Sequence, residues 1–304
     1  MAYTALDTTS MAATVVRVPR VGLGPSDQIH QLVASLYPYW TVSGVALDFS
    51  GCSFLAAEAV AVLAGFTWFR GSRGLQTQLL VDSMSAGVRK NLWKMGFLEL
   101  FGGHPCSYPD NSLPLYRQDL RYDGPDIMKY IKREVMSRPE MPMMSKGLSK
   151  EIRRSFVEIF GNVFYHSRSA IGGLVCGQVY PNRKEIQLTF FDAGVGIGAK
   201  VRAHVKGIPD DPAAIRWALE RGTSTLAISE GHPRGLGLYL LRQFLKLNGG
   251  ELRVYANGGC YRECRDQNRA VVFHPPLNGT LMDLRIRVEK GVSYRLSDEA
   301  EDVT

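Results

Sequence analysis

The first third of the chain alternates short apolar runs with longer stretches in which apolar residues recur every three or four positions. Short runs of this kind are typical of β-strands, and the longer periodic stretches are typical of amphipathic helices. The predicted strands and helices lie, in order, at 15–18, 27–37, 45–49, 56–69, 77–81 and 83–92. Because strands and helices alternate, we expect residues 14–102 to form an α/β domain.

Residues 103–145 have a different character, because prolines recur among Gly, Tyr and Asp. Pro105, Pro109, Pro114 and Pro125 interrupt both kinds of periodicity. A helical pattern returns only at 126–136. We expect this segment to be a Pro-rich linker that carries one helix and separates two domains.

A second set of elements follows over residues 146–290. Helices are predicted at 149–166, 211–221 and 238–247, and strands at 172–180, 185–191, 251–255, 270–273 and 280–288. In the last strand Met282 and Leu284 alternate with Asp283 and Arg285, which predicts one buried and one solvated face. The expected fold class is α/β with two domains, the second a sandwich of a mixed sheet with helices on one face. Residues 291–304 form an acidic tail.

Composition places the chain among soluble globular proteins. It has 304 residues, of which 45% are hydrophobic and 21% charged. No apolar run approaches the roughly 20 residues that cross a bilayer, and residues 1–17 lack the features of a secretory signal. The five Cys are scattered along a chain too long to need disulfides. We therefore expect a cytoplasmic protein without membrane association.

The formal net charge of +7 is concentrated in residues 151–290. Such an excess attracts nucleic acid or serves an anionic small ligand such as a nucleotide. No run of Lys and Arg interleaved with aromatic residues is present. The pattern therefore disfavours nucleic acid as a partner.

Three polar residues recur at every fourth position of the predicted helix 149–166. Glu158, Asn162 and His166 place a carboxylate, an amide and an imidazole in one column on the helix. Taken alone, this column fits the solvated face of an amphipathic helix.

The predicted strand 185–191 leads directly into Asp192, Gly194 and Gly196. A carboxylate at the end of an apolar strand, followed by glycines, indicates the rim of a pocket. Gly194, Gly196 and Ala199 also satisfy a dinucleotide-binding fingerprint, but the strand that should follow is absent. No stretch of the chain fits a P-loop.

The predicted helix 238–247 is preceded by Arg234-Gly235-Leu236-Gly237. Free backbone N–H groups and the helix dipole at such a start favour an anion, and phosphate is the natural ligand. Upstream, residues 222–231 have the composition of a mobile lid. Downstream, Gly279-Thr280 begins a strand and offers a hydroxyl to the same pocket.

Four blocks, in this order, resemble the ATP-binding boxes of the GHKL superfamily, which includes gyrase B, heat-shock chaperone ATPases, mismatch-repair ATPases, sensor histidine kinases and anti-sigma-factor serine kinases. They are Glu158-x-x-x-Asn162-x-x-x-His166, Asp192-x-Gly194-x-Gly196, Gly235-x-Gly237 and Gly279-Thr280. The resemblance covers residues 146–290 and is closest in style to the anti-sigma-factor kinases.

The resemblance implies an α/β sandwich that binds ATP and Mg²⁺. It implies that Asp192 contacts the adenine amine with Thr280 assisting, and that Asn162 coordinates Mg²⁺. Gly235 and Gly237 would donate backbone N–H groups to the phosphates. Arg234 is a further candidate phosphate contact, and Leu236, Gly194 and Gly196 are expected among the nucleotide-binding residues. A carboxylate one helical turn before Asn162 can act as a general base beside the γ-phosphate, which is the role expected of Glu158.

Residues 45–54, the Ala-rich helix after them and 83–97 resemble STAS domains, the fold of anti-sigma-factor antagonists. Those domains often carry a phosphorylatable Ser at the head of this helix. Here the matching stretch is Leu55-Ala56-Ala57-Glu58, without a hydroxyl. We therefore expect a scaffold or partner-docking role for this domain.

The leading hypothesis is an Mg-ATP-binding regulatory protein that hydrolyses ATP slowly and signals through its lid to a partner protein. A serine kinase acting on a separate STAS-type antagonist and a non-catalytic nucleotide-binding adaptor are the alternatives. A sensor histidine kinase is disfavoured, because none of the six His begins an H-[ED] motif. The expected partner is a regulatory protein, STAS-type or sigma-factor-related, and a homodimer is left open.

Overall fold

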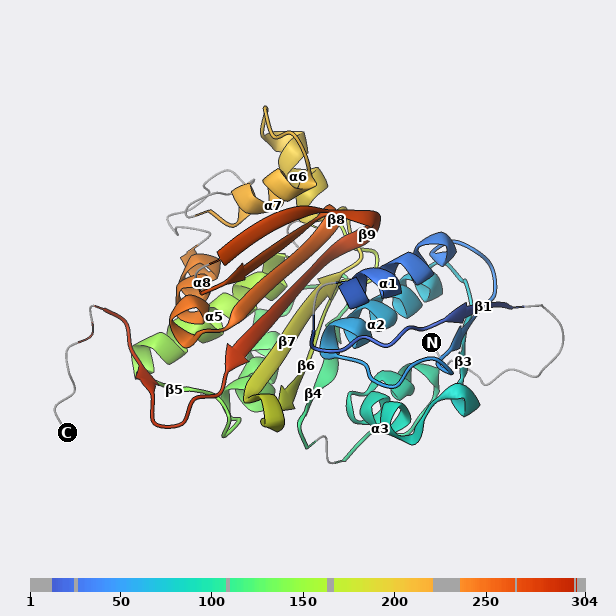
Figure 1. Ribbon diagram of the computed structural model, residues 1–304, viewed down its shortest axis with the longest axis horizontal. Coiled ribbons are helices and arrows are strands. Elements are labelled where there is room, and N and C mark those ends of the chain that lie inside the picture. The colour runs from blue at the N-terminus through green and yellow to red at the C-terminus, as the bar shows by residue number, and fades with distance from the viewer. Residues whose placement is uncertain are drawn as a thin grey trace.

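Two β-sheets, one of three strands and one of five, organise the chain (Figure 1). The computed structural model of the protein describes residues 13–24, 27–107, 110–162, 167–220, 236–265, 267–297 and 299. The smaller sheet belongs to the N-terminal part and the larger to the C-terminal part. The expected fold class, α/β with two domains, is confirmed.

The N-terminal domain is built on a parallel sheet in the order β1-β2-β3. Parallel neighbours require crossover connections, and helices supply them here. The strands and helices of this domain are β1 (Thr14–Arg17), α1 (Asp27–Leu36), β2 (Val45–Asp48), α2 (Ala57–Ser72), β3 (Thr77–Leu80) and α3 (Ala86–Lys94). The short 3₁₀ helices are η1 (Tyr37–Tyr39), η2 (Val81–Ser83) and η3 (Phe97–Phe101).

The C-terminal sheet has the order β4-β6-β7-β9-β8. Its strands are β4 (Ser112–Gln118), β6 (Gly173–Tyr180), β7 (Glu185–Asp192), β8 (Glu251–Cys264) and β9 (Gln267–Arg287). Every neighbouring pair runs antiparallel. The mixed strand directions expected for this sheet are therefore wrong, because short connections join β6 to β7 and β8 to β9 as hairpins.

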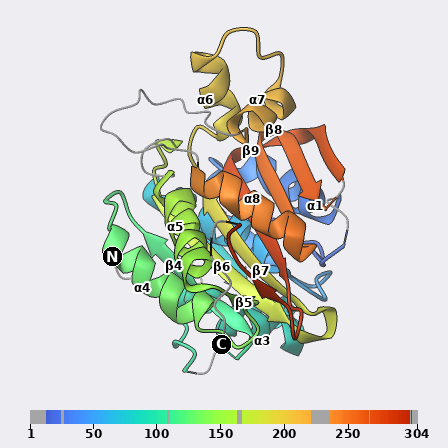
Figure 2. The same cartoon turned by 90° about the vertical axis from the view of Figure 1, so that its left-hand side faces the viewer.

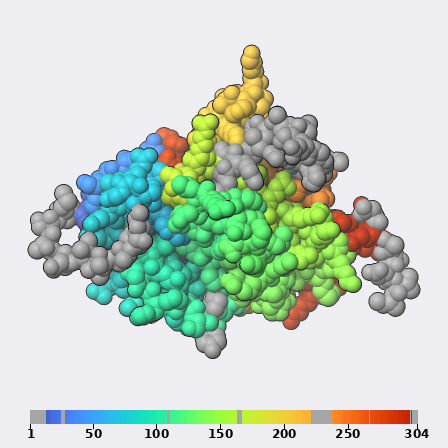
Figure 3. Space-filling view, turned by 180° about the vertical axis from the view of Figure 1, so that it is seen from behind, coloured from blue at the N-terminus to red at the C-terminus, as the bar shows by residue number. Residues whose placement is uncertain are grey.

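Helices cover both faces of the C-terminal sheet, although they come from different domains (Figure 2). Its own helices α4 (Gly124–Tyr130), α5 (Lys146–Asn162) and α8 (Leu236–Asn248) lie on one face, and α2 of the N-terminal domain packs on β6 and β7 from the other. The remaining elements are a π-helix η4 (Ile131–Met136), a 3₁₀ helix η6 (Pro181–Arg183), α6 (Ile197–His204), α7 (Asp211–Ala218), β5 (Met143–Met144) and β10 (Ser293–Tyr294). From behind, the yellow region around α6 projects above the rest of the surface (Figure 3).

Alternate residues of β7 and β9 point to the two faces. Phe190 and Met282 belong to the apolar cluster formed with α5 and α8. Phe191 and Leu281 belong to the cluster formed with the N-terminal domain. Gly65 of α2 lies directly against the Phe191 ring, so helix and sheet approach closely at this point.

The polar face of β9 is buried beneath α2, so the prediction that this face is solvated is wrong. Asp283 accepts hydrogen bonds from Gln187 Nε2 (2.7 Å), Thr189 Oγ1 (2.6 Å) and Arg285 Nε (3.0 Å). The Arg285 guanidinium also lies 3.5 Å from Glu58 of α2. Asp283, Arg285 and Glu58 are exposed by only 0%, 3% and 2%. Burial, and next the charge of Asp283, raise the pKa of Glu58.

The expected linker 103–145 is wrong in one respect, because residues 112–118 form β4, an edge strand paired with β6. Pro114 lies where the register of this pair shifts, and an edge strand tolerates a proline at such an irregularity. The tail is also partly structured: β10 pairs with β5, and Glu299 accepts a hydrogen bond from the Gly147 amide at the start of α5 (3.0 Å).

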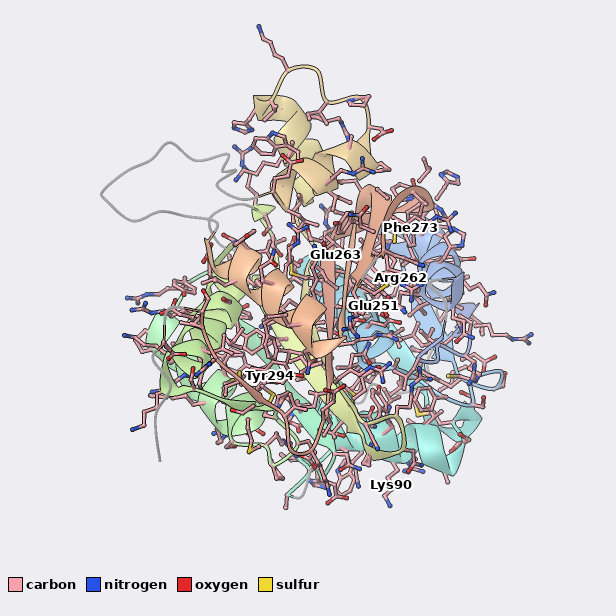
Figure 4. All side chains as sticks on the ribbon, turned by 60° about the vertical axis from the view of Figure 1, so that its left-hand side comes forward. Lys90, Glu251, Arg262, Glu263, Phe273 and Tyr294 are labelled. Carbon is pink, nitrogen blue, oxygen red and sulfur yellow. The ribbon has the colours of Figure 1, made fainter. Side chains whose placement is uncertain are left out.

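The hairpin β8–β9 is much longer than the three short strands that the pattern predicts. Its outer part contacts α1 of the N-terminal domain, where the rings of His30 and Phe273 meet edge to face with centroids 5.2 Å apart. Phe273 in turn packs on Tyr255 of β8. Figure 4 labels Phe273 on this arm, with Glu251 and Arg262 on β8.

Substituting Gly65 tests the packing of α2 on the five-stranded sheet. We expect Gly65→Ala to lower the free energy of unfolding by about 1–3 kcal/mol, because the added methyl overlaps the buried Phe191 ring. Gly87→Ala in α3 is the matched control, since a Cβ there meets nothing within 4 Å and Ala favours the helix. Urea unfolding followed by circular dichroism measures both, and equal stabilities would contradict this packing.

Candidate functional site

Asp192 ends β7 and lies opposite Thr280 of β9. Side chains alternate between the two faces along a strand, so Asp192 points to the same face as Phe190, two residues earlier. This is the face that α5 and α8 cover, where Met282 also lies. The carboxyl is buried, with 5% of the residue exposed, and one oxygen accepts a hydrogen bond from the Gly194 amide (2.8 Å). Burial raises the pKa of Asp192 to about 7, against the lowering effect of hydrogen bonds from Gly194 and Thr280.

The adjoining Gly279 allows β9 to approach the end of β7 closely. It has a φ of +103°, and a Cβ at this position would overlap the carbonyl of Asp192. Both constraints require glycine. The Gly279-Thr280 pair that the sequence predicted near Asp192 therefore lies directly beside it.

The Gly-rich turn after Asp192 is held by protein groups along its length. The Gly194 amide donates to the Asp192 carboxylate, and the Val195 amide donates to the Ser167 carbonyl (2.7 Å). The Ile197 amide donates to Thr280 Oγ1 (3.2 Å), and the Ala199 amide donates to Asn257 Oδ1 (3.0 Å). Because these four donors are already satisfied within the protein, they are not free to bind a phosphate.

The glycines of this turn are also explained by packing. A Cβ at Gly194 would overlap the Ser167 carbonyl, and one at Gly196 would overlap the carboxamide of Asn257. Gly196 has a φ of +77° as well. Ser167 and Asn257 were not predicted from the sequence, and the Asn257-Gly258 pair was visible only as a turn signal.

Glu158 and Asn162 lie on α5, which packs against α8. At the start of α8, a Cβ on Gly237 would overlap the Glu158 carboxylate and would lie 3.1 Å from the Ser155 Cα. The two helices therefore touch where Glu158 meets Gly237. Asn162 is the last described residue of α5 and is half-buried.

A buried ion pair holds α8 against β8. Glu263, exposed by 3%, accepts hydrogen bonds from Arg242 Nε (2.6 Å) and Nη2 (3.0 Å), and Lys246 Nζ lies 2.9 Å from it. Such a bidentate contact holds both partners in one geometry. Glu263 is labelled on β8, facing α8, in Figure 4.

Several predicted site residues lie outside the described residues. They are Arg234, Gly235, His166 and the lid 222–231, and of Leu236 only the backbone is described, as the first residue of α8.

Apart from Asn162, the described site residues form two groups on one face of the sheet. Asp192, Gly194, Gly196 and Thr280 make the first, and Glu158 with Gly237 makes the second. Phe156 of α5 packs on Phe190 of β7, with ring centroids 6.4 Å apart. The helix that carries Glu158 therefore lies directly on the strand that ends in Asp192.

Within the described ranges, no group of three or more His, Cys, Asp or Glu side chains could hold a metal ion. A hard cation such as Mg²⁺ is often bound through one or two protein oxygens together with phosphate oxygens and water. Glu158 carries oxygens of this kind beside Gly237 at the start of α8, and Asn162 lies one helical turn further along α5.

Comparisons with known proteins give little further information. No family model matches the chain, and no curated protein matches it. Among solved structures, a histidine kinase domain from the blue-light activated histidine kinase of Erythrobacter litoralis EL346 is similar at 15% identity, with a TM-score of 0.26, over 68% of this chain and 76% of that one. A likeness this weak carries no argument. Among the helices of the described residues, none has the length and apolar character that crossing a membrane requires.

The raised pKa of Asp192 predicts a pH-dependent stability. Between its ordinary pKa of 3.8 and about 7, the folded protein keeps a proton that the unfolded chain releases. The stability from this protonated carboxyl is fully present below the ordinary pKa of 3.8 and is lost as the pH rises to about 7. Asp192→Asn cannot ionise, so its free energy of unfolding relative to wild type should rise by roughly 2–3 kcal/mol between pH 5 and pH 7. Chemical denaturation at each pH measures this difference.

The control is Asp82→Asn, at an exposed aspartate of η2. A difference between Asp192→Asn and wild type that stays constant with pH would show that Asp192 does not hold a proton in the folded state.

Proposed function

We propose that the C-terminal domain binds Mg-ATP between α5, the turn after β7 and the start of α8, and that the chain is a nucleotide-dependent regulatory protein. The observation that carries this proposal is the buried Asp192 carboxyl beside Thr280, on the sheet face covered by the helix that bears Glu158. The order of the four sequence blocks supports the same assignment.

The surroundings of Asp192 suit a neutral base better than a phosphate. The amide donors of Gly194, Val195, Ile197 and Ala199 are taken by protein acceptors. A carboxylate accepts a hydrogen bond from the exocyclic amine of adenine, whereas guanine presents a carbonyl oxygen at that position. Adenine would therefore occupy this end, with Thr280 beside it and Gly194 and Gly196 forming its wall.

The start of α8 suits the phosphates. This helix has 13 residues, and its first N–H groups and dipole favour negative charge. Gly235 and Gly237 would donate backbone N–H groups there, and Arg234 would add a charge. The Asn162 amide oxygen would be the protein ligand of Mg²⁺, which supplies charge neutralisation on the triphosphate when bound.

Glu158 would act as the base. Its carboxylate meets Gly237 at the proposed phosphate end, so it can accept a proton from water or from a substrate hydroxyl as the terminal phosphate is attacked. With water the protein is a slow ATPase, and with a protein hydroxyl it is a serine kinase.

The head of the protein's own α2 offers no hydroxyl to such a kinase. Ala56 and Ala57 stand at its head without a hydroxyl, both fully buried, and the Ala57 amide donates to Gln187 Oε1 of β7 (3.2 Å). A kinase activity would therefore need a separate protein, of the STAS type or related to a sigma factor.

Asp192→Asn tests the adenine contact. We expect the variant to bind Mg-ADP about tenfold more weakly, equal to 1.4 kcal/mol. If the Asn oxygen keeps the hydrogen bond from the Gly194 amide, the adenine amine faces either an NH₂ donor or an amide oxygen, which is a weaker acceptor than a carboxylate. Isothermal titration calorimetry at pH 8 measures it, with Asp82→Asn as the matched control and Mg-GDP as the second ligand. Unchanged ADP affinity, or equal affinity of the wild type for ADP and GDP, would remove Asp192 from the site.

Glu158→Gln separates binding from chemistry. With γ-labelled ATP and Mg²⁺, we expect phosphate release to fall by at least a hundredfold while nucleotide affinity stays within threefold. Glu151→Gln is the control, two turns earlier on α5, where Glu151 pairs with Arg154. Label on an added STAS partner would identify a kinase. Wild-type protein that binds ATP but neither releases nor transfers phosphate would be the adaptor.

A further inference from the structure

β8 contains a bulge that aims one side chain at the Gly-rich turn. The pairing register with β9 shifts between Ala256 and Gly259. Asn257, at this bulge, has a φ of +51°, a conformation that Asn tolerates better than most residues. Bulges of this kind redirect a side chain away from the strand ladder and are common beside functional sites.

The Asn257 carboxamide binds both ends of the turn. Its Oδ1 accepts from the Ala199 amide (3.0 Å), and its Nδ2 donates to the Val195 carbonyl (3.0 Å). Ala199 is the third residue of α6, and Gly196, at the N-cap, has no side chain to cap the helix. Asn257 therefore supplies from a distant strand the acceptor that an N-cap residue normally provides.

A neighbouring contact strengthens this arrangement. The Gly258 amide donates to Asp211 Oδ2 of α7 (2.9 Å), and Asp211 forms an ion pair with Arg202 of α6. A Cβ on Gly198 would meet the carboxylate of Asp211 and, at 3.2 Å, the Asn257 oxygen. The bulge thus holds the turn, α6 and α7 together.

We propose that Asn257 is a positioning residue of the nucleotide site, which fixes the turn 194–199 so that Asp192 and the turn present one shape to the base. The inference rests on the proposed function. Asn257 does not touch the nucleotide, and it acts through the two backbone groups that it binds. Without its carboxamide, the Ala199 amide and the Val195 carbonyl lose their partners and the turn loses its anchor.

The test compares three variants of the full chain. Asn257→Ala removes both hydrogen bonds. Asn257→Asp keeps the acceptor for Ala199, where the dipole of α6 favours a carboxylate. Asn268→Ala is the matched control, because Asn268 is an exposed residue near the tip of the same hairpin.

The measurements are the Kd for Mg-ADP and the hydrogen exchange of the Ala199 amide. We expect Asn257→Ala to raise the Kd about tenfold, equal to 1.4 kcal/mol, and to speed the exchange. We expect Asn257→Asp to recover at least half of the affinity loss on a logarithmic scale and Asn268→Ala to match wild type. If Asn257→Asp recovers the affinity for Mg-ADP, the loss in Asn257→Ala comes from the missing acceptor for Ala199 and not from a general loss of stability.

Folded Asn257→Ala protein with wild-type affinity would overturn the inference, and so would an aspartate variant no better than the alanine variant. If wild-type protein does not bind Mg-ADP, the proposed function fails and Asn257 has no nucleotide site to position. In that case the exchange of the Ala199 amide still decides whether Asn257 holds the turn.

Discussion

The whole structure depends on the burial of both faces of the five-stranded sheet. One face is covered by α5 and α8, whereas the other carries Asp283 and Arg285 beneath α2. Charges in this position are tolerated only when they are paired and hydrogen-bonded, and removing one member of such a group costs about 3–5 kcal/mol. The N-terminal domain supplies Glu58 to this group, so it completes the C-terminal sheet rather than standing beside it.

This constraint assigns different tasks to the two faces. The face beneath α2 is filled by Phe191, Leu281 and the charged group, and it joins the domains. The opposite face holds Asp192 and Thr280 at the strand ends and is the one on which α5 lies. Phe191 points toward the N-terminal domain, and the next residue of β7, Asp192, points toward the site. The candidate site and the domain interface therefore share the same strand.

Much of this arrangement could be predicted from the sequence, because it follows from local periodicity. The order of elements, Asp192 at a strand end and the opening of α8 near Gly237 all have local signals. The burial of Asp283 and Arg285 could not be predicted, since it depends on a helix more than 200 residues earlier in the chain. β4 was missed because Pro114 lies at an irregularity of an edge strand. The role of Asn257 could not be predicted, because a bulge directs its side chain toward the turn. A bulge depends on how two strands pair and not on local composition.

The long hairpin β8–β9 touches α1 through Phe273 and reaches the turn through Asn257. A two-stranded ribbon joined by hydrogen bonds resists stretching, although it can twist, and here the bulge between Ala256 and Gly259 interrupts the ladder between the two contacts. A shift of the N-terminal domain against the sheet would thus reach the turn as torsion of this ribbon, without a hinge or an unfolding step. The hairpin gives the molecule a mechanical connection between its two halves that the covalent linker at the other end of the sheet does not provide.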